Sequence, residues 1–152
     1  MRKSCLIIAL FTVALVCAAP STRAQGNVKQ GPDVVRDPEM EKDSLHNLEV
    51  ARQYFKLRKA YKASLARCEE IIAGNPIFSK IDEVLFIAGE SSLRLSENKG
   101  KQAVKTATDK LREDARDYLS QLVNDYPDSK FREEALESLK SLGGAKPKPD
   151  NP

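Results

Sequence analysis

The feature that most constrains the fold is the stretch from Leu48 to Pro76, in which apolar residues recur at helical spacing. Leu48, Ala51 and Phe55 stand three and four residues apart, so they share one face of a helix. A second apolar stripe comprises Tyr61, Leu65, Cys68, Ile71 and Ile72. Gly74 is a suitable left-handed cap, and Pro76 prevents a longer helix. The stretch predicts two amphipathic helices joined by a very short turn.

This arrangement resembles one tetratricopeptide (TPR) unit, a helix-turn-helix of about 34 residues. The matching residues are Leu48, Ala51, Phe55, Tyr61, Ser64, Cys68, Ile71 and Asn75-Pro76. Arg52 stands where the motif usually has Gly, and Cys68 where it usually has an aromatic residue. Both fit the packing, because Arg can lay its stem along a surface and Cys packs as a small hydrophobe. With two later segments, FSKIDEVLFIAGESSLRL and YLSQLVNDYPDSKFREEAL, the chain is similar to the TPR-type outer-membrane assembly lipoproteins (BamD-like) over most of Leu45–Leu142.

The first 24 residues have the pattern of a secretory signal peptide. A basic Arg2-Lys3 pair precedes an apolar run from Leu6 to Ala19, and a small residue, Ala24, precedes the expected cleavage point. We therefore predict export to the periplasm or the outer-membrane periphery. Val16 fits poorly before a lipid-modified cysteine, so we predict a protein without an anchor and keep lipidation of Cys17 as the alternative.

Removal of the signal peptide changes the charge balance. Arg2, Lys3 and Arg23 are lost from the 25 basic residues, which leaves 22, equal to the 22 acidic residues. A near-neutral chain has no basic excess for neutralising phosphates, so nucleic acid is excluded as a partner.

The rest of the chain predicts a short right-handed TPR-like solenoid of about five helices, all-α, with no strand pattern. The expected segments are a signal peptide (1–24), a flexible leader (25–36), the helical domain (37–142) and a disordered tail (143–152). The expected helices are 38–57 with Asp37 as cap and Leu45 turned inward, 59–73, 79–95 with a Ser79–Asp82 capping box, 101 or 104–124, and 130–142 ended by Gly143-Gly144. The second unit is expected to carry an insertion at 96–108, between its two helices. Gly89 is expected to let a partner helix approach closely.

The sequence holds no catalytic or metal-binding constellation. His46, the single histidine, is expected to be an exposed helix residue, because a zinc site needs more ligands from more than one element. Cys68 lies on an apolar stripe without an activating base, so we expect an inert core thiol. We predict that the protein is not an enzyme and needs no cofactor.

Two binding surfaces remain as candidates. The TPR resemblance implies a groove for a protein partner, lined by the first helix of each unit: His46, Glu49, Gln53, Lys56, Glu83, Phe86 and Glu90. We expect Phe86 to pack against a neighbouring helix rather than anchor a partner. The alternative surface, for an anionic envelope polymer or a membrane, is the basic cluster Lys56, Arg58, Lys59, Lys62 and Arg67, which Glu69 and Glu70 balance in the simpler interpretation.

Our leading hypothesis is a non-enzymatic interaction scaffold of the bacterial cell envelope. Because two TPR-like units and one helix fall short of about three repeats, binding to a partner or self-association would add stability.

Overall fold

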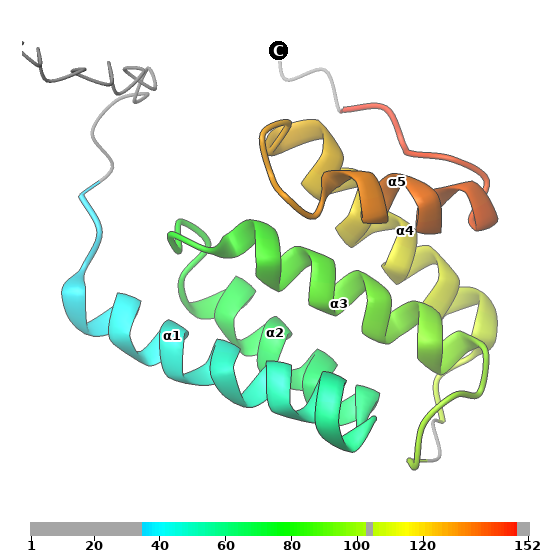
Figure 1. The fold of residues 1–152 in the computed structure, drawn as a ribbon, viewed down its shortest axis with the longest axis horizontal. Helices are drawn as coiled ribbons and strands as arrows, with labels where there is room; N and C mark the ends of the chain where they lie inside the picture. Colours follow the sequence, from blue (N-terminus) through cyan, green and yellow to red (C-terminus); the bar gives the residue numbers. More distant parts are fainter. Residues whose placement is uncertain (1–34, 103–104, 149–152) are drawn as a thin grey trace, which may run out of the picture. The chain divides into compact units, whose positions relative to one another are not determined.

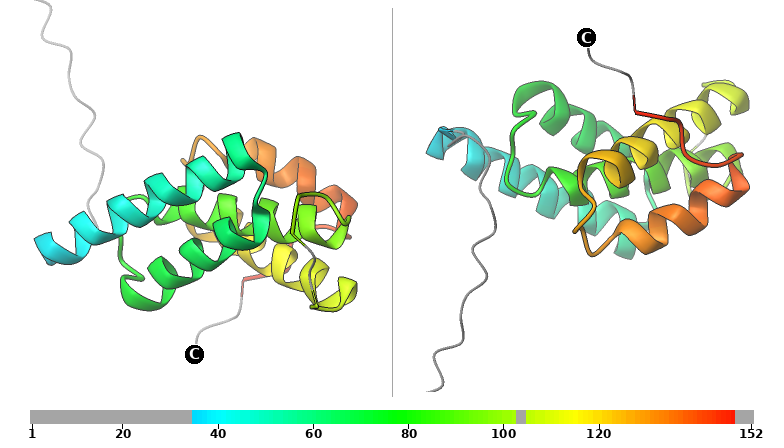
Figure 2. Two further views of the ribbon diagram at one scale, coloured as in Figure 1. Left: turned by 90° about the horizontal axis from the view of Figure 1, so that it is seen from below. Right: turned by 90° about the horizontal axis from the view of Figure 1, so that it is seen from above.

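The computed structural model describes residues 35–102 and 105–148, so the expected signal peptide and nearly all of the leader lie outside the described part. The elements are α1 (Pro38–Arg52), the π-helix η1 (Gln53–Arg58), α2 (Tyr61–Gly74), α3 (Ile81–Ser96), α4 (Thr108–Asp125) and α5 (Arg132–Ser141). Over these residues the structure has five α-helices and no strand, which confirms the prediction of an all-α, TPR-like solenoid. Figures 1 and 2 show α1, α3 and α5 in one layer, with α2 and α4 behind them.

Helix α3 is the centre of the core. It packs against α2 on one side and α4 on the other, and 14 of its 16 residues are buried. Gly89 confirms the prediction of a close approach, because a Cβ atom at this position would lie only 2.6 Å from Leu119 Cγ in α4. Helix α2 is joined to α1 by the Ser64 hydroxyl, which donates to the Ala51 carbonyl at 3.0 Å. Most of the predicted apolar stripes are therefore core, as expected.

Helix α1 differs from the prediction at the start of its inward face. Asp37 caps it as expected, accepting from the Glu39 amide at 2.8 Å. Leu45, expected inside, is 40% exposed, because the inward row begins at Ser44, four residues before Leu48. Asn75 donates its side-chain amide to the Ser44 hydroxyl at 3.1 Å, so this buried position is polar.

The predicted caps of α2 and α3 are wrong. Gly74 is the last residue of α2 and its φ is not positive; the cap is Asn75, with φ −143°. Ser79 does not cap α3, which begins at Ile81, because its hydroxyl donates to Glu41 of α1 at 2.8 Å. Asp82 accepts instead from the Ser129 hydroxyl at 2.7 Å. These polar side chains join neighbouring units rather than ending their own helices.

Helix α4 begins at Thr108, later than the predicted start at residue 101 or 104. The preceding loop reaches back to α2, where the Gln102 side chain accepts from the Ala63 amide at 3.2 Å. Gly100, with φ +107°, lies against the turn before α2. The described part of the insertion thus contacts the N-terminal end of α2 in the first unit.

Helix α5 ends as predicted, with Gly143 and Gly144 at φ +89° and +88°. The tail expected to be disordered from residue 143 instead lies against α4 as far as Lys148, joined by hydrogen bonds and ion pairs. Among the described helices, none is long and apolar enough to cross a membrane.

Candidate functional site

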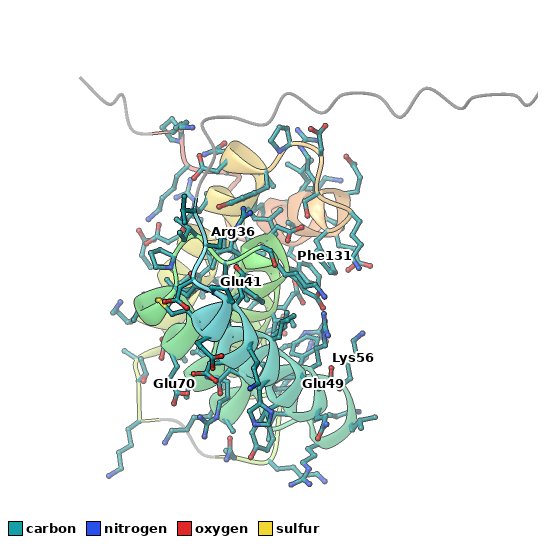
Figure 3. All side chains as sticks on the ribbon, turned by 90° about the vertical axis from the view of Figure 1, so that its left-hand side faces the viewer. Arg36, Glu41, Glu49, Lys56, Glu70 and Phe131 are labelled. Carbon is teal, nitrogen blue, oxygen red and sulfur yellow. The ribbon has the colours of Figure 1, made fainter. Side chains whose placement is uncertain are left out.

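A hollow on the layer of α1, α3 and α5 lies where η1, α3 and α5 meet. We call it the groove; its lining residues are Phe55, Lys56, Phe86, Glu90, Arg94, Lys130, Phe131, Glu134, Glu137 and Ser138. Figure 3 shows Lys56 and Phe131 on one side of the helical stack and Glu70 of α2 on the other. The first helices of successive units therefore line a common surface, as the TPR resemblance implies.

Two stacked aromatic rings form the apolar part of the groove. Phe86 of α3 and Phe131 before α5 have ring centroids 4.9 Å apart and an interplanar angle of 17°. Phe86 is 9% exposed and belongs to the core cluster, whereas Phe131 is only partly buried. Lys130 places its ammonium 4.7 Å from the Phe131 centroid, a distance typical of a cation–π contact. Phe86 thus packs against the next unit, and Phe131 presents the accessible aromatic surface.

An ion pair between successive units lies beside the groove. The Arg52 guanidinium of α1 donates to both carboxylate oxygens of Glu83 in α3, at 2.6 and 2.7 Å. Burial acts to raise the pKa of Glu83, but the hydrogen bonds and charge of Arg52 outweigh it and lower that pKa. The same hydrogen bonds raise the pKa of Arg52. Arg52 therefore serves to fix α1 against α3, which explains an Arg at a position where the TPR motif usually has Gly.

Glu90 makes the matching connection between α3 and α5. Its carboxylate accepts hydrogen bonds from the Ser138 hydroxyl of α5 and, at 3.1 Å, from Arg94. The predicted groove residues Glu83, Phe86 and Glu90 are thus mostly buried and hold the units in place. Of the four residues that the sequence analysis placed in the groove from the first helix, Lys56 lines it.

The other three residues predicted for the groove lie elsewhere, two of them on α1 and Gln53 at the start of η1. His46, Glu49 and Gln53 are exposed, and none of them lines the groove. Glu49 accepts from Arg52 at 3.1 Å. Lys130 and Phe131 were not predicted as site residues; the parallel turns after Pro76 and Pro127 place them at the start of the third unit and were the signal that could have identified them.

The basic cluster surrounds the turn between η1 and α2. Lys56, Arg58, Lys59 and Lys62 are exposed, and Lys59 has a left-handed φ of 50°. Arg67 differs from them because its guanidinium pairs with the Glu70 carboxylate at 2.6 Å. The segment between Glu49 and Glu69 contains no acidic residue.

A large apolar side chain lies within this basic cluster. Leu57 is 80% exposed, the highest value among the helical residues with large apolar side chains. The guanidinium of Arg58 lies 5.7 Å from the Tyr54 ring centroid. The turn therefore combines positive charge with exposed apolar surface, a combination that the sequence analysis did not recognise.

No catalytic centre is evident in the described residues. Cys68 is buried, and burial raises the pKa of its thiol to about 12, so the reactive thiolate does not form near neutral pH. His46 is exposed, and residues 35–102 and 105–148 contain no group of three His, Cys, Asp or Glu side chains that could hold a metal ion.

A comparison with protein-family models identifies the family of this chain. The family model YfiO, described as an outer membrane lipoprotein, matches residues 36–144, which cover the groove, the basic turn and all five helices. The comparisons with curated proteins and with solved structures found no match.

Proposed function

The chain belongs to the YfiO family of outer membrane lipoproteins, and from this we propose that it is a non-enzymatic interaction scaffold of the bacterial cell envelope. Its TPR-like helices would present a surface to a protein partner, as in outer-membrane protein assembly factors. Such a role requires export to the periplasm or the outer-membrane periphery. The all-helical fold is compatible with it.

The observation that carries this proposal is the partly exposed Phe131 ring in the groove. Phe131 stacks on Phe86 and has the Lys130 ammonium over its ring, yet it stays partly exposed, and aromatic side chains of this kind are common anchors at protein interfaces. The ion pair of Arg52 with Glu83 and the hydrogen bond of Ser138 with Glu90 hold the surrounding helices in place. Binding would then require little reorganisation, which favours affinity.

The charges around Phe131 indicate which segment would fit. Lys130 lies over the ring and Lys56 lines the same groove, whereas Glu134 and Glu137 line it from α5. We propose a partner segment with an apolar side chain over Phe131 and an acidic group toward the two lysines. A basic group on the same segment would face α5.

Site-specific photocrosslinking tests this proposal in the native envelope. A photoreactive amino acid at Glu134 in the groove should crosslink a defined partner, whereas the same group at Glu70 on α2 should not. Phe131→Ala should reduce the crosslink at position 134 without altering the helical content of the chain. Equal crosslinking at both positions, or a crosslink unaffected by Phe131→Ala, would contradict a partner site in the groove.

The exposed Leu57 favours a second candidate function, which is binding to an anionic membrane surface. Basic side chains near an anionic bilayer contribute about 1 kcal/mol each, and an apolar side chain can enter the interface. Lys56, Arg58, Lys59 and Lys62 supply the charge around Leu57. The simpler interpretation is that Glu69 and Glu70 balance this positive charge. In the structure the ion pair with Glu70 is made by Arg67, the member of the cluster farthest along the chain from Leu57.

Vesicle sedimentation separates the two candidates. The full chain should bind phosphatidylglycerol vesicles but not phosphatidylcholine vesicles, and high salt should weaken the binding. Lys59→Glu together with Lys62→Glu should abolish it, whereas Phe131→Ala should leave it unchanged. If phosphatidylcholine vesicles bind equally well, or the glutamate variant still binds, the basic turn is not a membrane site.

A further inference from the structure

The most specific set of contacts outside the groove lies between α4 and residues 141–148, which we call the C-terminal segment. After Gly143 and Gly144 the chain turns back and follows α4, as the red segment in Figures 1 and 2 shows. The family match ends at residue 144, so the contacts of Lys146 and Lys148 lie beyond it. Helix α4 binds this segment through two rows of side chains, one at positions 112, 116, 120 and 124 and the other at positions 113, 117 and 125.

The first row contacts the main chain of the C-terminal segment. Its members are Arg112, Arg116, Ser120 and Asn124, which share one face of α4 because four residues make about one helical turn. Arg112 donates to the Ser141 carbonyl at 2.8 Å, and Arg116 donates to the Gly144 carbonyl at 2.8 Å. The Lys146 amide donates to the Ser120 hydroxyl at 2.8 Å, and Asn124 donates to the Lys146 carbonyl at 2.9 Å. The row thus satisfies both main-chain polar groups of Lys146.

The second row contacts side chains and is acidic. The Lys146 ammonium pairs with Glu113 and with Asp117, and these hydrogen bonds raise the pKa of Lys146. Lys148 pairs with Asp125 at 2.9 Å. Pro147 between them has no amide hydrogen to satisfy and restricts Lys146 to an extended conformation. The two rows therefore recognise an extended main chain and a lysine at a defined position.

Ser120 supports a role in binding rather than incidental contact. Its side chain is 3% exposed in the folded chain, and the Lys146 amide is its hydrogen-bond partner. Without the C-terminal segment this hydroxyl would lose that partner. We propose that the rows on α4 form a binding site for an extended peptide segment of the type Gly-Gly-Ala-Lys-Pro-Lys, which the chain's own tail occupies and from which an equivalent segment of a partner protein displaces it.

The energetics of the contacts allow such a displacement. The ion pairs of Lys146 and Lys148 involve partly exposed groups, and pairs of this kind contribute little to stability and weaken with salt. A short tether holds the tail near its site at an effective concentration of the order of millimolar. The tail therefore acts as an intramolecular competitor. A partner segment binds when its concentration, relative to its dissociation constant, exceeds the effective concentration of the tail relative to the tail's own dissociation constant. This inference is independent of the groove and of the basic turn.

Competition with a labelled peptide tests the proposal. The probe is a fluorescent peptide of residues 141–148, SLGGAKPK, and the protein is the full chain carrying Lys146→Ala, which removes the main side-chain contact of the tail. The variant should bind the peptide about tenfold more tightly than the unaltered chain does, because its internal competitor is weakened. Lys140→Ala is the matched control, since Lys140 pairs with Glu137 within α5 and should not alter binding.

Two further variants make the result decisive. Adding Asp117→Asn to the Lys146→Ala chain, or replacing the lysine after alanine in the peptide with alanine, should abolish the gain in binding. Far-UV circular dichroism must show the same helical content for all chains. In the unaltered chain, the Lys146 amide should exchange its hydrogen slowly at low salt, and Ser120→Ala should make that exchange fast. Equal peptide binding by the unaltered and Lys146→Ala chains, or rapid exchange of the Lys146 amide at low salt, would overturn the proposal.

Discussion

Replacing Gly89 with alanine tests the packing of α3 against α4 quantitatively. The added Cβ would lie 2.6 Å from Leu119 Cγ and 2.7 Å from Leu119 Cδ2, about 1 Å inside the usual carbon–carbon contact distance. Leu119 is fully buried, so its side chain cannot move into solvent. Overpacking of this kind costs about 1–3 kcal/mol, whereas alanine in a helix gains about 1 kcal/mol over glycine. We expect Gly89→Ala to lower the free energy of unfolding by about 1 kcal/mol.

A double-mutant cycle separates these two contributions. Leu119→Ala removes the atoms that the new methyl group meets, so in this background Gly89→Ala should raise the free energy of unfolding by about 1 kcal/mol. The sign of the effect should therefore reverse between the two backgrounds. Gly74→Ala is the matched control in an intact chain, because Gly74 is helical and no atom lies within 4 Å of its would-be Cβ. This control should be neutral or stabilising.

Urea unfolding followed by far-UV circular dichroism measures all four chains of the cycle and the control. The slope of the unfolding free energy against urea should be the same in each, which shows that the compared states are alike. If Gly89→Ala stabilises the chain with Leu119 present, or destabilises it equally in both backgrounds, the close approach of α3 and α4 at this position is refuted.

Three further predictions concern buried and terminal groups. Cys68→Ser should lower the free energy of unfolding by about 1–3 kcal/mol, and native Cys68 should resist thiol reagents; rapid labelling would contradict a core position. Arg52 lowers the folded pKa of Glu83, so the pair should stabilise the fold above the ordinary carboxyl pKa of about 4.3 and lose this effect as the pH falls through the folded pKa. Urea titrations at several pH values should show that Glu83→Gln removes this part of the pH dependence. A pH profile that the variant leaves unchanged would count against the pair. Mass spectrometry of the native protein should show an N-terminus at Gln25 and no lipid on Cys17, and a chain beginning at an acylated Cys17 would show that the alternative is correct.

Periodicity predicted the parts of the fold that depend on local chemistry. The apolar stripes containing Leu48 and Cys68, the Asp37 cap and the Gly143-Gly144 ending each follow from residues within a few positions of one another. Gly89 was also predictable, because a glycine inside a strong helical pattern needs a packing reason. Residues close together in the sequence determine these features.

The site could be predicted only in part, because its contacts join residues far apart in the chain. Arg52 and Glu83 are 31 residues apart, and Ser138 and Glu90 are 48 apart. Phe86 stacks on Phe131, which sequence spacing alone did not place near it. The row of Arg112, Arg116, Ser120 and Asn124 was visible as a four-residue spacing on α4, but nothing local indicated its partner in the tail.

The incorrect prediction of a cap at Ser79 and Asp82 has a physical cause. Ser79 and Asp82 have the residue types of a helix cap, and a cap satisfies one backbone donor of a single helix. In a solenoid each unit contacts its neighbours alone, so the stacking depends on contacts between units. A Ser79 hydroxyl that bonds Glu41 and an Asp82 carboxylate that bonds Ser129 each join two units, and in this fold those contacts replace the local cap. Since the same stacking sets the distance between Lys56 and Phe131, side chains that resemble local caps in the sequence take part in shaping the groove.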